Sequence, residues 1–204
     1  MSNNFFSPNQ KINGGAMFAS WNSKDGSVYF KILKQIALNE DKRGNFDGKN
    51  PIFVKLTQDE AAGFIRAVNN NSNMSFYHTF DNDVTTGSFK YYEVDAKDKN
   101  GKIFKKYGFG LTIKRNDNEI KVGFTLDSAQ RLSLFLQNAL RHIFDAEYAQ
   151  DIKDAQEYSK KKKETSKTLK SEYVPEESEE SEKSESEKKE NKEGEDFSNL
   201  DEEF

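Results

Sequence analysis

Apolar and polar residues alternate along much of the chain between residues 15 and 125, the pattern of β-strands with one buried face. Turn-forming residues interrupt this pattern, most clearly at residues 22–26, 98–101 and 116–118. We expect seven strands, at residues 15–21, 27–37, 51–56, 74–80, 87–95, 104–115 and 119–125. Neighbouring strands joined by such short turns predict antiparallel sheets.

Two segments change to the period of an α-helix. Thr57 precedes the first, and Glu60 stands three positions later as in a capping box, so we expect a helix from there to about residue 70. The second carries apolar residues three, four and seven positions apart, and this stripe should be core: Ala129, Leu132, Phe135, Leu136, Ala139, Leu140, Ile143 and Phe144. The two strand-to-helix junctions are alike, which suggests a weak internal repeat. The expected fold class is therefore α+β, with two antiparallel sheet-plus-helix halves of the ββββα kind.

Large apolar residues almost disappear after about residue 150, where Lys, Glu and Ser dominate. Such a composition buries too little apolar surface to offset chain entropy. We therefore expect a flexible N-terminus at residues 1–11, a folded core at residues 12–150, a disordered charged linker at residues 151–195 and an acidic tip at residues 196–204.

The sign of the net charge changes at the same point of the chain. Residues 1–150 contain about 20 Lys and Arg against about 16 Asp and Glu, whereas residues 151–204 contain about 11 against about 19. A mildly basic core suits a polyanionic ligand, and the acidic tail would compete with that ligand.

Catalysis is not expected. The chain has no cysteine and only two histidines, His78 and His142, and it shows neither a phosphate-cradling glycine loop nor the spacing of metal ligands. We therefore expect a protein that is not an enzyme and that uses no cofactor or metal. The N-terminus lacks a signal peptide, and no apolar run is long enough for a membrane span, so we expect a cytoplasmic protein, at the nucleoid or, if it is viral, in the host cytoplasm.

Aromatic rings and lysines are interleaved along the predicted strands. Rings on which bases stack and lysines that contact phosphates are what single-stranded nucleic acid requires, and each stacked base contributes about 1 to 3 kcal/mol. Strand alternation puts Tyr29 with Lys31, and Lys90 with Tyr92, on one face of their strands, while Phe30 and Phe89 point to the core. The candidate DNA-binding residues are Phe18, Trp21, Tyr29, Lys31, Tyr77, Lys90, Tyr92, Lys106, Lys114 and Lys121. His78 is more consistent with a hydrogen-bonded structural residue.

The last nine residues form an acidic peptide with spaced apolar anchors and a terminal phenylalanine. This peptide resembles the acidic tips of bacterial and phage single-stranded-DNA-binding proteins, which recruit replication, recombination and repair enzymes. The resemblance implies a partner-binding role for Phe197, Leu200, Asp201, Glu202, Glu203 and Phe204. A ring that fills a pocket while carboxylates meet basic residues around it is physically reasonable.

The middle of the chain resembles the Whirly family and the related transcription-coactivator fold, over about residues 12–146. The resemblance is carried by Asn-Pro-Ile-Phe-Val-Lys-Leu-Thr at residues 50–57, Ser-Phe-Tyr-His at 75–78, Gly-Ser-Phe-Lys at 87–90 and Ile-Lys-Val-Gly-Phe-Thr at 120–125. It implies a Whirly-like fold, binding of single-stranded DNA over the sheet surfaces with little sequence preference, and a homodimer or higher oligomer formed through helices. The segment at residues 11–17 departs from the family pattern.

Together these features predict a protein that coats and protects single-stranded DNA during replication, recombination or repair and recruits partners through its tip. Three alternatives stay open: a transcription-regulating or RNA-binding adaptor of the same fold, an OB-fold protein that binds single-stranded DNA, and an interaction protein without nucleic-acid affinity. Two strand-to-helix junctions and a long last helix argue against the OB-fold.

Overall fold

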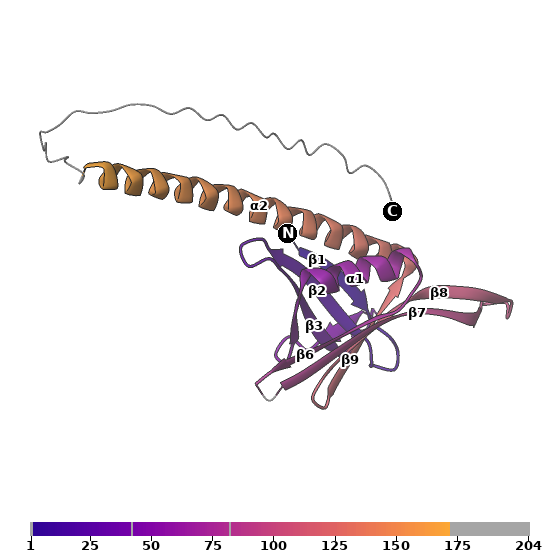
Figure 1. Cartoon of the computed structure of the whole chain (residues 1–204). Coiled ribbons are helices and arrows are strands. Elements are labelled where there is room, and N and C mark those ends of the chain that lie inside the picture. Colours follow the sequence, from indigo (N-terminus) through magenta and orange to yellow (C-terminus); the bar gives the residue numbers. More distant parts are fainter. Residues whose placement is uncertain (1, 42, 82, 172–204) are drawn as a thin grey trace, which may run out of the picture. The chain divides into compact units, whose positions relative to one another are not determined.

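A computed structural model describes residues 2–41, 43–81 and 83–171 (Figure 1). The chain forms two units, residues 1–159 and residues 160–204, and the described part of the second unit is the end of the last helix. The strands are β1 (Ser2–Ser7), β2 (Gly15–Asn22), β3 (Ser27–Leu38), β4 (Gly44–Phe46), β5 (Ile52–Leu56), β6 (Met74–Phe80), β7 (Asp83–Lys97), β8 (Ile103–Arg115) and β9 (Asn118–Thr125). The helices are α1 (Gln58–Asn69) and α2 (Leu126–Ser171).

The strands form two antiparallel sheets, one in each half of the chain. In the first sheet the order is β1-β2-β3-β4, and β5 also pairs with β3. The long strand β3 pairs with β5 along its first part and with β4 along its last part. The second sheet is the meander β6-β7-β8-β9, and its β7–β8 hairpin projects beyond the neighbouring strands (Figure 1). The α+β fold class, with two antiparallel sheets and two helices, is confirmed.

Aromatic rings join the two sheets and α1 into one core. The Phe64 ring of α1 lies 5.5 Å from the Phe30 ring of the first sheet and 5.1 Å from the Phe89 ring of the second. Phe89 in turn stacks on Phe109 at 4.7 Å and meets Phe124 edge-on at 5.7 Å. Since Phe30 and Phe89 are both fully buried, the inward direction expected from strand alternation is confirmed.

A capping box begins α1. The Glu60 amide donates to Thr57 Oγ1 at 3.2 Å, and the Thr57 amide donates to Glu60 Oε2 at 2.9 Å. These two bonds satisfy amide groups that the first turn of a helix leaves without a helical partner. They also fix the point where β5 ends and α1 starts, as the sequence predicts.

Substituting Thr57 by alanine is expected to lower the free energy of unfolding by about 1 kcal/mol, because the Glu60 amide loses its acceptor. Thr57→Ser keeps an acceptor oxygen and serves as the matched control. Urea denaturation followed by circular dichroism measures both variants, and equal losses in the two would show that the cap bond is not the cause.

The N-terminus is a strand, although the sequence predicts a flexible segment at residues 1–11. β1 pairs with β2, and Phe5, only 2% exposed, packs its ring 5.4 Å from that of Phe124. The Arg131 guanidinium lies over the Phe5 ring at 4.8 Å, and its Nη2 donates to the Asn4 carbonyl at 2.9 Å. These contacts come from residues far along the chain, so the short polar segment alone does not reveal them.

Helix α2 is also longer than predicted. It continues to Ser171, through the first part of the linker at residues 151–195 that was expected to be disordered. This part is rich in Lys, which favours a helix without core packing. Gln150 Nε2 donates to Asp154 Oδ1 at 2.8 Å, one turn later. Phe144, expected in the core, is half exposed. None of the described helices is long and apolar enough to cross a membrane, and the acidic tip lies outside the described residues.

Candidate nucleic-acid interface

The outward face of the first sheet carries a regular arrangement of rings and lysines. Strand register places Phe18 opposite Lys31 and Lys31 opposite Phe53, so these three side chains form one row across β2, β3 and β5. The next row is formed by Ser20, Tyr29 and Lys55 in the same way. Phe6 of β1 is also exposed, and its ring lies 5.7 Å from that of Phe18. We call the following set the ring-and-lysine face: Phe6, Phe18, Tyr29, Lys31, Phe53 and Lys55.

Contacts within this face hold the rings in place and leave surfaces open. Lys31 Nζ lies 5.8 Å from the centroid of the Phe53 ring, and Lys55 Nζ lies 6.0 Å from that of Tyr29, both cation–π distances. Phe53 nevertheless remains 54% exposed. Within the described part of the chain, neither lysine has a carboxylate partner. The charges on this face are therefore available to a phosphate.

Tyr29 is held by its own hydroxyl group. The hydroxyl donates a hydrogen bond to the Asp25 carboxylate in the preceding turn, and this bond, with a smaller effect of burial, raises the pKa of Tyr29 above its ordinary value. The bond holds the ring on the sheet surface in its neutral form. A neutral, positioned ring is suited to stacking against a base.

The outward face of the second sheet is more polar. Tyr77, Thr86 and Lys114 form one row across β6, β7 and β8, and Tyr77 is 63% exposed. Lys121 Nζ bridges to Glu119 Oε1 at 2.8 Å, and this contact lowers the pKa of Glu119. A salt-bridged lysine is less available to a phosphate than the lysines of the first sheet.

The remaining lysine and tyrosine candidates of this sheet lie toward the projecting hairpin. Lys90 and Tyr92 share the outward face of β7, as expected, and Lys106 stands opposite Val94 further along the hairpin. The Tyr92 side chain lies against Gly108, since a Cβ added there would be 2.8 Å from Tyr92 Cζ. Part of the Tyr92 surface is thus occupied by its own neighbour strand.

Trp21 does not lie with the other candidates, which corrects the expectation that it faces a ligand. It belongs to the inward side of β2, together with Met17 and Ala19, because side chains alternate along a strand. Its ring meets Phe135 of α2 edge-on at 5.3 Å and stacks on His142 at 5.8 Å. Trp21 and His142 therefore hold α2 against β2.

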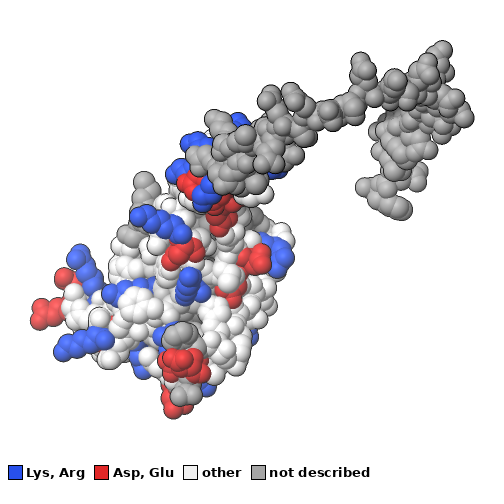
Figure 2. All heavy atoms as spheres, turned by 60° about the vertical axis from the view of Figure 1, so that its left-hand side comes forward, with Lys and Arg blue, Asp and Glu red and all other residues white. Residues whose placement is uncertain are grey.

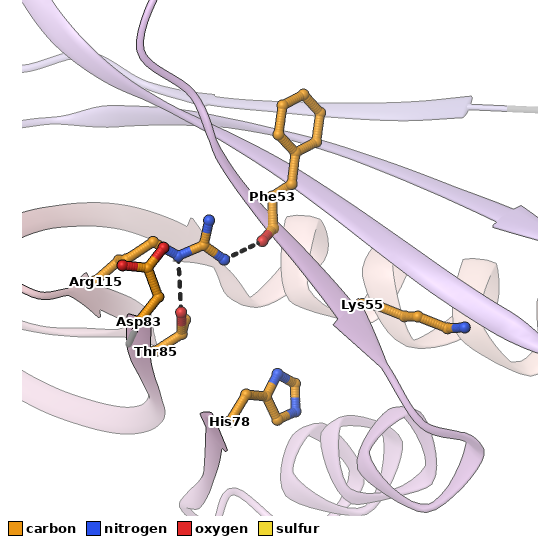
Figure 3. A pocket seen from close by; sticks show the side chains of 6 residues that line it. All are labelled: Phe53, Lys55, His78, Asp83, Thr85 and Arg115. Carbon is orange, nitrogen blue, oxygen red and sulfur yellow. Dashed lines mark hydrogen bonds between the residues drawn. The ribbon is translucent and has the colours of Figure 1, made fainter. Parts of the chain in front are cut away.

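A cavity of about 240 Å³ lies where β5 of the first sheet comes close to the second sheet (Figure 3). We call it the edge groove, and its lining residues are Phe53, Lys55, His78, Asp83, Thr85 and Arg115. Phe53 and Lys55 also belong to the ring-and-lysine face, so the two regions are continuous. Further hollows extend the groove past Lys49 on one side and past Tyr77 on the other.

Hydrogen bonds fix the polar side chains of the edge groove. Arg115 Nε donates to Thr85 Oγ1 at 2.8 Å, and Arg115 Nη2 donates to the Phe53 carbonyl at 2.6 Å, so this guanidinium joins the two sheets (Figure 3). His78 Nε2 lies 2.8 Å from Glu60 Oε1 on α1. The expected structural, hydrogen-bonded role of His78 agrees with this contact.

On the face of the molecule drawn in Figure 2, lysines and arginines are spread out instead of forming one patch. Figure 2 shows cationic side chains distributed over one face of the molecule, with acidic side chains between them. Electrostatic attraction alone is then modest, and a nucleic acid held here would depend also on stacking against the exposed rings.

No protein-family model matches the chain, and no curated protein matches it. Two solved structures are similar to it at 16% sequence identity. One, from Trypanosoma brucei, is described as MRP1/MRP2; it has a TM-score of 0.44, and the match covers 72% of this chain and 87% of the other. The second is described as a guide-RNA-binding protein complex bound to a guide RNA, with a TM-score of 0.45 and coverage of 69% and 90%.

The ligand named for one of these structures differs from the ligand expected from the sequence. We expected a protein that coats single-stranded DNA in replication, recombination or repair, whereas the ligand named for the second structure is a guide RNA.

Proposed function

We propose that the chain is an RNA-binding protein, not an enzyme, and that it holds single-stranded RNA across the first sheet and along the edge groove. The observation that carries the proposal is the row Phe18, Lys31 and Phe53, where a cation stands between two outward rings. Bases would stack on the rings while the lysine contacts the phosphate that links them. This is how sheets that bind single strands combine affinity with tolerance of sequence.

Polar side chains beside the rings support RNA as the ligand. A protein distinguishes RNA from DNA through the 2′-hydroxyl group, which both donates and accepts hydrogen bonds. Ser20 lies in the row of Tyr29 and Lys55, and Thr57 and Thr79 line the hollow that extends the groove past Tyr77. The guide RNA named for the similar structure agrees with this ligand class.

Three expectations from the sequence are proposed together with RNA binding. We propose a distant relationship to the Whirly group, assembly of the chain into a homodimer or higher oligomer, and binding of a partner protein by the acidic tip. Pull-down with a peptide of residues 196–204 and with the same peptide carrying Phe204→Ala tests the last point, since the terminal ring is the expected anchor.

The experiment that tests the proposed function is a fluorescence-anisotropy titration of labelled oligouridine with the full chain. Competition with the matching deoxyoligonucleotide and with duplex RNA separates the ligand classes. Salt-sensitive binding that unlabelled single-stranded RNA displaces best would support the proposal. Absence of binding at low salt, or better displacement by DNA, would contradict it.

Replacing Lys31 and Lys55 together by alanine is expected to reduce the dependence of RNA affinity on salt. Each lysine that neutralises a phosphate adds about 0.7 to the slope of log affinity against log salt for a single strand, so the double variant should lose about 1.4. Titrations at several salt concentrations measure the slope. Lys24 and Lys99, exposed in turns away from the face, provide the control substitutions, and an equal loss in that pair would remove the special role of Lys31 and Lys55.

A further inference from the structure

The edge groove has a polar floor where the apolar inner face of the second sheet ends. Strand register aligns His78, Thr85 and Arg115 in one row across β6, β7 and β8. The adjacent row is formed by Phe76, Gly87 and Ile113 and belongs to the core. Asp83 lies two residues before Thr85 on β7 and so shares its face. The groove thus places a guanidinium, a hydroxyl and a carboxylate together (Figure 3).

Hydrogen-bonding capacity remains on the two charged groups. Arg115 has more N–H donors than its bonds to Thr85 and Phe53 use. Asp83 Oδ1 accepts from Asn116 Nδ2 at 2.8 Å, and Oδ2 accepts no hydrogen bond from the residues that the structure describes. Thr85 is only 3% exposed, so the bond that orients Arg115 is shielded from water. The groove therefore offers fixed donors and a carboxylate acceptor to one ligand.

We infer that the edge groove binds a guanine base of the RNA. Guanine carries two neighbouring N–H donors, its ring N–H and its amino group, which a carboxylate can accept together. It also carries two neighbouring acceptors, the carbonyl oxygen and the imidazole nitrogen, which are the usual partners of arginine. Asp83 would take the first pair and Arg115 the second. Uracil lacks two neighbouring acceptors, and cytosine and adenine lack the two adjacent donors.

The size of the groove agrees with one base. Its volume of about 240 Å³ lies below the roughly 300 to 1,000 Å³ of pockets that enclose whole drug-sized ligands. Phe53 borders the groove with its carbonyl toward Arg115, while its ring points away from the groove, to the side where the ring-and-lysine face continues (Figure 3). The inference rests on the proposed RNA binding and adds a base preference to it.

The test compares the affinities of four twelve-nucleotide RNAs: oligouridine, and oligouridine with two central guanosines, two adenosines or two inosines. Wild-type protein should bind the guanosine RNA at least about 5-fold more tightly than oligouridine, the lower end of what a bidentate base contact contributes. Inosine, which lacks the amino group, should lose most of this preference. In Asp83→Asn the guanosine preference over oligouridine should fall, because only the contact with Arg115 remains, and inosine should bind as well as guanosine.

Asp81→Asn is the matched control, because Asp81 is an exposed neighbour that does not line the groove. It should still bind the guanosine RNA more tightly than oligouridine and than the inosine RNA. Circular dichroism should show that Asp83→Asn and Asp81→Asn are both folded. If oligouridine binds but the guanosine RNA binds no more tightly, the proposed guanine site is wrong while the proposed RNA binding is still supported. The same conclusion follows if Asp83→Asn keeps the full guanosine preference of the wild type. A preference for 5′-phosphorylated over unphosphorylated oligouridine that needs Arg115 would assign the groove to a phosphate and overturn the inference. Failure of every RNA to bind would instead refute the proposed function.

Discussion

A protein in which Phe18 and Phe53 are both replaced by alanine is expected to bind single-stranded RNA at least about 30-fold more weakly than wild type. Each ring that stacks on a base contributes about 1 to 3 kcal/mol, and the two rings flank Lys31 in one row of the first sheet. The loss should come without unfolding, because both rings point away from the core. Anisotropy titration with oligouridine measures the affinity.

Phe104→Ala provides the control for this double variant. The Phe104 ring is also exposed, at 47%, but lies on the β7–β8 hairpin away from the first sheet. It should leave the affinity within about 3-fold of wild type, below the effect of one stacked base. If the double variant binds as tightly as wild type while Phe104→Ala does not, the hairpin and not the ring-and-lysine face is the RNA-binding surface.

Phe89→Ala should have the largest effect on stability, lowering the free energy of unfolding by about 3 to 5 kcal/mol. The ring is fully buried and touches Phe64, Phe109 and Phe124, so its removal leaves a cavity where α1 and the second sheet meet. Urea denaturation followed by circular dichroism gives the value.

Phe144→Ala removes the same side chain from the exposed side of α2 and should change stability by less than about 0.5 kcal/mol. A loss at Phe89 no greater than that at Phe144 would show that the core can close around the missing ring.

Strand alternation and helix period predicted the start of both helices and the strands of residues 15–125 other than β4, because each of these elements buries one face and its sequence shows which. β5 is the clearest case, with Ile52, Val54 and Leu56 buried between exposed Phe53 and Lys55. The capping box at Thr57 marked the end of this strand. Local patterns of this kind need no information from distant residues.

Elements without such a pattern were not predicted. β1 contains only two apolar residues, and Phe5 becomes a core residue through Phe124 and Arg131, more than a hundred positions away. The end of α2 has no apolar stripe to continue, yet its side chains favour a helix. The prediction of disorder from composition is therefore wrong for residues 151–171, which are helical.

The candidate interface was predicted only in part. Alternation correctly grouped Tyr29 with Lys31, and the same reasoning could have added Phe53 and Lys55 and placed Trp21 on the inner face. Arg115 could not be found in this way, because it lies on the inward face of its strand and acts through its bond to another sheet. A groove between two sheets depends on their packing, which no single strand encodes.

The Glu60 carboxylate connects the edge groove to the start of α1, since one oxygen accepts from the Thr57 amide and the other lies 2.8 Å from His78. A ligand that draws His78 away, or holds it more firmly, changes the free energy of opening the first helical turn. Thermodynamic linkage is reciprocal, so fraying of that turn must change the affinity of the groove by the same factor. Amide hydrogen exchange at Thr57 and Glu60 is thus a readout of groove occupancy that needs no label on the ligand.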